Sequence, residues 1–104
     1  MQIRIVEINN WLSTQFRDKL IVEEVYLIGS ILINNFRMIS DVDLVQFLKF
    51  EQLDELKNHF TETQKIKQEF KHKFGKYLHV TSFTNNELED YIEFMSKNKS
   101  QKIK

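Results

Sequence analysis

The sequence has no cysteine and no proline, and it has only two glycines. Without cysteine, neither a disulfide framework nor a thiolate metal site can form. Without proline, and with so little glycine, the chain has few local breaks, so we expect regular helices and strands joined by short polar turns. The sequence also has no internal repeat and no low-complexity linker. These absences favour a single compact unit over a chain of several domains.

An excess of either charge is also lacking, as is a long apolar run. Fifteen basic and fifteen acidic residues cancel, so we do not expect nucleic acid as a partner. No apolar run approaches the roughly 18 residues of a membrane span, and we therefore expect a cytoplasmic location without membrane attachment. At 104 residues, the chain can bury a core of its own. We predict one domain over residues 1–96 and a basic, flexible tail over residues 97–104.

Apolar spacing predicts the order of the elements. Residues 5–16 carry apolar side chains at intervals of three and four, which predicts a helix. Residues 23–29 and 41–50 are short apolar runs that predict two strands. Residues 51–74 repeat the helical spacing, and Gly75 follows where a helix would end in a glycine cap.

The last part of the chain predicts one more strand and one more helix. Residues 76–83 form the third strand-like run. The helix that follows has its predicted buried face at Leu88, Tyr91, Ile92 and Met95. The predicted fold class is therefore α/β (α+β), with a small mixed sheet and helices packed on it.

Two aspartates interrupt the second predicted strand. Asp41 and Asp43 are separated by one residue, so their side chains point to the same face, roughly 7 Å apart along the strand. Like charges at this distance repel each other, and a divalent cation between them would remove the repulsion. Mg²⁺ prefers oxygen ligands and commonly takes one or two protein carboxylates together with substrate phosphates. The pair is a candidate metal site.

Gly29 and Ser30 end the preceding predicted strand. A glycine lets the backbone approach a ligand closely, and the N–H groups that follow, with the serine hydroxyl, can hold a phosphate. Either motif alone is common in proteins and has an ordinary structural explanation. Together they predict a phosphate-binding bend that faces a metal-binding pair, and phosphoryl transfer needs both parts.

The sequence from Gly29 to Asp43 resembles the signature of the DNA polymerase beta-like nucleotidyltransferases. The signature residues are Gly29-Ser30, ten intervening residues and DVDL, with Ser40 directly before the first aspartate. The length of the chain resembles that of the minimal, antitoxin-type nucleotidyltransferases. This resemblance implies Mg²⁺-dependent transfer of a nucleoside monophosphate, AMP from ATP, to an acceptor hydroxyl. It implies that Gly29, Ser30 and Ser40 bind the nucleoside triphosphate and that Asp41 and Asp43 are catalytic metal ligands.

The chain departs from this family at the third carboxylate, which normally lies on the strand after the long helix. Residues 76–83 contain no acid. His79 and Thr81 share a face of that predicted strand, and general-base catalysis would fall to His79; a purely structural histidine is the alternative. The other two histidines, His59 and His72, are too far apart on their helix to share a metal ion, and we predict that both lie on the surface.

Two functions therefore remain open. The first is an active minimal nucleotidyltransferase that uses ATP or another nucleoside triphosphate with Mg²⁺. The second is a catalytically degenerate relative that binds a nucleotide or a partner protein, as an antitoxin does. Several members of the resembling group pair with an all-helical protein and modify it, so the resemblance implies a helical partner protein here as well.

Overall fold

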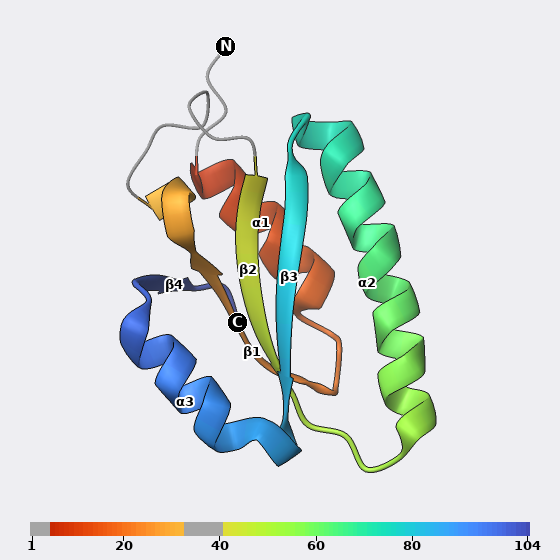
Figure 1. Cartoon of the computed structure of the whole chain (residues 1–104). Helices are drawn as coiled ribbons and strands as arrows, with labels where there is room; N and C mark the ends of the chain where they lie inside the picture. Colours follow the sequence, from red (N-terminus) through yellow and green to blue (C-terminus); the bar gives the residue numbers. More distant parts are fainter. Residues whose placement is uncertain (1–4, 33–40) are drawn as a thin grey trace.

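The structure, a computed structural model, describes residues 5–32 and 41–104. Its elements follow the predicted order, and a short strand, β4, is added at the end (Figure 1). In chain order they are α1 (Ile5–Phe16), β1 (Val22–Ile28), the 3-10 helix η1 (Gly29–Leu32), β2 (Asp41–Leu48), α2 (Leu53–Phe74), β3 (Tyr77–Thr84), the 3-10 helix η3 (Asn85–Glu87), α3 (Leu88–Lys97) and β4 (Ser100–Lys102).

The four strands form one sheet in the order β3-β2-β1-β4. β1 pairs antiparallel with β2 on one side and with β4 on the other. β2 and β3 are parallel, which requires a crossover between them, and α2 is that crossover. The sheet is therefore mixed, and the predicted α+β fold class is confirmed.

The helices divide between the two faces of the sheet, and Figure 1 shows α2 and α3 on opposite sides of the strands. α1 and α2 cover one face, where they share a large buried cluster with β1, β2 and β3. α3 packs on the other face, against a smaller cluster around Ile28, Val45 and Tyr91. Strand side chains alternate, so Val42 and Leu44 enter the large cluster and the neighbouring aspartates face the side of α3.

α2 is 22 residues long and ends where the sequence predicted. Gly75 follows it with φ 74°, a left-handed conformation that glycine adopts without steric cost, and its N–H donates to the carbonyl oxygen of Lys71 at 2.9 Å. Ile66, Phe70 and Phe74 are the buried apolar positions of the helix. Within the part of the chain that the structure describes, no helix has the length and apolar character needed to cross a membrane.

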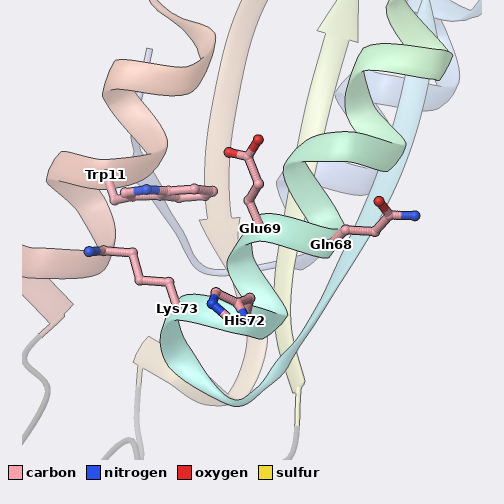
Figure 2. Close-up of a pocket in the computed structure, with 5 residues that line it drawn as sticks. All are labelled: Trp11, Gln68, Glu69, His72 and Lys73. Carbon is pink, nitrogen blue, oxygen red and sulfur yellow. The ribbon is translucent and has the colours of Figure 1, made fainter.

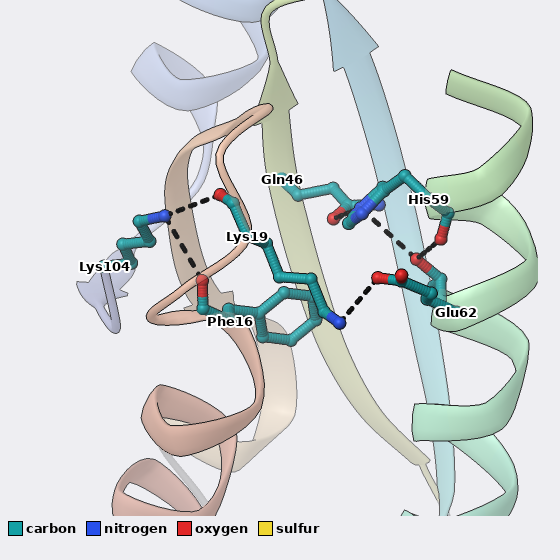
Figure 3. Close-up of polar contacts among 7 residues, drawn as sticks. Phe16, Lys19, Gln46, His59, Glu62 and Lys104 are labelled. Carbon is teal, nitrogen blue, oxygen red and sulfur yellow. Dashed lines mark hydrogen bonds and ion pairs between the residues drawn. The ribbon is translucent and has the colours of Figure 1, made fainter. Parts of the chain in front are cut away.

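The prediction that His59 lies on the surface is wrong. Its side chain is only 3% exposed, and its Nε2 lies 2.9 Å from Oε1 of Gln46 on β2 (Figure 3). The amide of Gln46 in turn donates to Oγ of Ser82 on β3 at 2.9 Å. An imidazole can be buried when it has a hydrogen-bonding partner, and this partner lies on another element. His72 is exposed, as predicted.

The prediction of a flexible tail over residues 97–104 is also wrong. β4 lies within this segment and pairs with the outer side of β1. Beyond β4, Nζ of Lys104 donates to the carbonyl oxygens of Phe16 and Lys19, at 3.2 and 2.9 Å (Figure 3). Phe16 is the last residue of α1, and a cation at the C-terminal end of a helix is favourable. The lysine-rich composition predicted a solvated tail. In the structure, this segment instead pairs with the edge of β1 that β2 does not occupy.

α3 buries only part of the predicted stripe. Tyr91 is 5% exposed and Met95 packs against the smaller cluster, as predicted, whereas Leu88 and Ile92 are 49% and 59% exposed. The helix is rotated so that Phe94 contacts Phe83 of β3, with ring centroids 5.3 Å apart. Contacts with aromatic residues of the sheet, Phe47 and Phe83, therefore accompany the side of α3 that faces inward.

Candidate functional site

One cross-strand row of the sheet brings the predicted site residues together. Ile28 of β1 is opposite Asp43 of β2, and Asp43 is opposite His79 of β3. Residues directly opposite each other point to the same face of a sheet, and neighbouring strands are about 4.8 Å apart. Asp41, two residues before Asp43, shares that face. The two aspartates and the histidine therefore form one group at the start of β2 and β3.

His79 contacts the first aspartate of the pair. Its Nε2 lies 3.3 Å from Oδ1 of Asp41, and the two side chains are 60% and 40% exposed. Both groups are thus accessible to a ligand from solvent. The sequence could not predict this contact, because it depends on the parallel register between β2 and β3.

The Gly29-Ser30 bend lies directly against Asp43. Gly29 has φ +79°, and a Cβ placed on it would lie 2.9 Å from Oδ2 of Asp43, closer than real Cβ contacts. Only glycine adopts this backbone conformation at little cost, and only glycine leaves room for the carboxylate. Ser30 is exposed in η1 next to this contact. The bend and the carboxylate pair are therefore adjacent, as the sequence predicted.

Ser40, the remaining predicted phosphate-binding residue, lies outside the described residues. Over residues 5–32 and 41–104, no group of three or more His, Asp or Glu side chains is placed to hold a metal ion. Two half-buried carboxylates on one face do not make a closed protein cage. They fit Mg²⁺ whose coordination is completed by substrate phosphates and water, a common arrangement for this ion.

α3 leaves this end of the face open. Its contacts lie toward the far ends of β2 and β3, where Tyr91 stacks on Phe47 with ring centroids 4.6 Å apart. The Tyr91 hydroxyl donates to Oε1 of Glu24 at 2.9 Å, and burial, followed by this bond, raises the pKa of Tyr91. Tyr91 therefore stays protonated and fixes α3 against β1, away from the aspartates.

Sequence reasoning missed one neighbour of the site. Ser100 of β4 is opposite Ile28, so it extends the row that contains Asp43 and His79 to a fourth strand. The only sequence signal was Ile103, an apolar residue within the lysine-rich end, which packs against the large buried cluster.

A separate pocket of about 600 Å³ lies on the face of the sheet that α1 and α2 cover (Figure 2). The Trp11 ring on α1 contacts Phe70 and Phe74 of α2, with ring centroids 5.9 Å apart in both cases. The pocket is lined by Trp11, Gln68, Glu69, His72 and Lys73. It is thus a groove between two helices, on the face opposite the aspartate pair.

The comparison with known protein families agrees with this geometry. The family model described as nucleotidyltransferase domain matches residues 9–103. The match includes the Gly29-Ser30 bend, both aspartates, His79 and β4. Neither a curated protein nor a solved structure gives a significant match. Because the family model covers nearly all of the chain, this protein belongs to the nucleotidyltransferase domain family.

Proposed function

We propose that this protein transfers AMP from ATP to an acceptor hydroxyl in a Mg²⁺-dependent reaction at the open face of its sheet. One observation carries the proposal: the Asp43 carboxylate lies against the Gly29 backbone, and Asp43 is opposite His79 on the neighbouring strand. Phosphate-binding backbone, carboxylates and a basic group are the parts that nucleotidyl transfer requires.

Each part has a role in binding the substrate. Gly29 and Ser30 bind the triphosphate, because a bend without a side chain lets phosphate oxygens approach the backbone. Asp41 and Asp43 would hold Mg²⁺, which when bound neutralises charge on the phosphate oxygens. The partial exposure of Asp41, at 40%, is consistent with a ligand that enters from solvent.

His79 takes the place of the acid that β3 lacks. Its imidazole accepts the proton of the acceptor hydroxyl. The hydroxyl oxygen forms a bond to the α-phosphorus, the bond from that phosphorus to the bridging oxygen breaks, and pyrophosphate leaves. The proximity of His79 to Asp41, at 3.3 Å, supports this role because the carboxylate can orient the imidazole ring.

The acceptor we propose is a hydroxyl of a helical partner protein, as the resemblance to the minimal, antitoxin-type nucleotidyltransferases implies. The site also suits a large acceptor sterically. α3 covers only the far end of this face, so no helix of the described residues stands between the aspartates and an approaching protein.

A second function rests on the same departure in β3. The strand YLHVTSFT contains no carboxylate, which favours a catalytically degenerate relative that binds a nucleotide or a partner protein without transferring AMP. The two functions differ in one measurable property. The enzyme forms a covalent product, whereas the degenerate relative only binds.

ATP labelled on the α-phosphate tests the proposal, with the purified protein, Mg²⁺ and a cell lysate as the source of acceptor. We expect α-phosphate label on a protein band only when the purified protein is added, and no such protein-dependent label from ATP labelled on the γ-phosphate. His79→Ala should slow transfer by about 10²–10⁴-fold, whereas Thr81→Ala, an exposed position on the same face of β3, should not. Binding of Mg-ATP without any transfer would favour the degenerate relative, and transfer of the γ-phosphate would contradict both functions.

A further inference from the structure

Over residues 5–32 and 41–104, β3 has a free edge that lacks the usual protection against pairing. β3 is the terminal strand of the sheet, and its outer side is unpaired within the described residues. It has eight residues in regular register with β2, and it contains no Lys, Arg, Asp, Glu or Pro. Soluble proteins usually protect an edge with charges, proline, a bulge or a very short strand. The opposite edge follows that rule, because β4 has only three residues.

An exposed ring and a pocket lie at the two ends of β3. Tyr77, the first residue, is 59% exposed. Phe83, near the other end, lines a pocket of about 330 Å³ together with Phe94, Asp90, Glu93, Lys97 and Asn98. Lys97 and Glu93 pair with each other at 2.8 Å, which leaves Asp90 as the charged lining residue without an ion pair among the described residues. Tyr77 and Phe83 are six residues apart in one strand, so both point to the same face of the sheet.

A two-fold axis matches the ring of one copy to the pocket of another. In a continuous antiparallel sheet, residues opposite each other point to the same face. Two identical β3 strands meet this condition only if one residue lies opposite its own counterpart in the other copy. The two-fold axis must therefore pass beside that residue. When that residue is Val80, Tyr77 of each copy lies opposite Phe83 of the other. An interface of this kind uses the same surface twice and closes on itself, giving a dimer and not a filament.

Charge at the ends of β3 is complementary in the same arrangement. Nζ of Lys71 lies 4.1 Å from the centroid of the Tyr77 ring. The ammonium group would therefore lie beside the Tyr77 ring in the interface as well. Asp90 lines the pocket that the ring would enter, and it forms no ion pair within the described part of the chain. Antiparallel pairing therefore places Lys71 of each copy near Asp90 of the other.

α2 leaves room for this pairing. His59 of α2 lies 2.9 Å from Gln46 of β2, and Ile66 and Phe70 pack in the large buried cluster, so the buried face of α2 is directed toward the interior of the sheet and not toward its free edge. The α2 helices of two copies would then be about 10 Å apart, which is a normal helix-packing distance. Leu53 and Phe60, 58% and 41% exposed, lie on the same side of α2 as Lys71 by helical spacing. The second copy would cover both.

We propose that two copies of this chain form a two-fold dimer through antiparallel pairing of their β3 edges, with Tyr77 of each copy in the Phe83–Phe94 pocket of the other. The pairing joins the two sheets into one. It places both aspartate pairs on the same face of the joined sheet, because the axis is perpendicular to it. The dimer does not depend on the proposed reaction.

Sedimentation equilibrium of the full chain tests this dimer, with an expected mass of twice the 12.6 kDa of one chain. Lys71→Glu and Asp90→Lys each place like charges at both ends of the interface, and each should weaken dimerisation by at least about tenfold. An equimolar mixture of the two variants should form a heterodimer, because every contact then joins opposite charges. Tyr77→Ala should also weaken the dimer, since it empties the pocket.

Lys99→Glu is the matched control, because it makes the same charge change beside the opposite edge of the sheet and should leave the dimer intact. Circular dichroism of each variant establishes that it is folded. A parent chain that stays monomeric at its highest soluble concentration overturns the proposal. So does a dimer that survives all three β3-edge changes, or a mixture of the two charge variants that fails to associate.

Discussion

The two faces of the sheet are covered by helices of different length, and this difference leaves the candidate site open. α2 has 22 residues and spans about 33 Å, more than the roughly 26 Å of an eight-residue strand. With α1 it closes its face. α3 has 10 residues and spans about 15 Å, so it covers only part of the other face. Among the helices of residues 5–32 and 41–104, none covers the end of β2 that carries Asp41 and Asp43.

The polar groups on the two faces differ in burial and in the length of their contacts. On the closed face Gln46 and His59 are buried and hydrogen-bonded to each other, as buried polar groups must be. On the open face Asp41 and His79 are partly exposed and their contact is longer, at 3.3 Å. The closed face therefore contributes stability, and the open face keeps groups available for a ligand.

The largest effect on this comparison should come from the closed face. Phe70 is fully buried there, so Phe70→Ala should lower the free energy of unfolding by about 3–5 kcal/mol. Ile92→Ala, at a 59% exposed position of α3, should change it by no more than about 0.5 kcal/mol. Urea unfolding of the two variants measures both values, and equal losses would show that the faces do not differ as described.

A smaller effect separates the two glycines. Gly29 and Gly75 both have positive φ, at 79° and 74°, so alanine at either position should cost roughly 1–2 kcal/mol of stability. Only at Gly29 would the new Cβ meet Asp43; nothing lies within 4 Å of a Cβ at Gly75. Gly29→Ala should therefore also weaken Mg-ATP binding, and Gly75→Ala should not. Calorimetric titration with Mg-ATP distinguishes the two variants. Equal affinity of both variants for Mg-ATP would contradict the proposed role of the Gly29-Ser30 bend in binding the nucleotide.

The smallest effect concerns pH. Burial lowers the pKa of His59 below the ordinary value of 6.5, so the folded state holds the imidazole neutral while the unfolded state protonates it first. The unfolded chain then binds more protons, and stability is lost as pH falls from 6.5 through the lowered pKa. Urea unfolding at a series of pH values should show this loss in the parent and in His72→Gln, an exposed control, but a weaker loss in His59→Gln. An unchanged pH dependence in His59→Gln would assign the loss to other groups.

Local patterns predicted the elements and the approximate place of the site. The end of α2 at Gly75 and the shared face of Asp41 and Asp43 follow from helical and strand periods, which a sequence displays directly. Register does not. The contact of His79 with Asp41, the burial of His59 against Gln46 and the pairing of β4 with β1 all join residues that are distant in sequence, so no local pattern carries them.

The most direct test of the proposed site is calorimetric titration of the parent, Asp41→Asn and Asp43→Asn with ATP in the presence of Mg²⁺. We predict that the parent binds and that each variant, folded by circular dichroism, loses Mg²⁺-dependent binding because one oxygen ligand becomes a neutral amide. Affinity equal to that of the parent in both variants would contradict the proposal that this aspartate pair holds the metal-bound nucleotide.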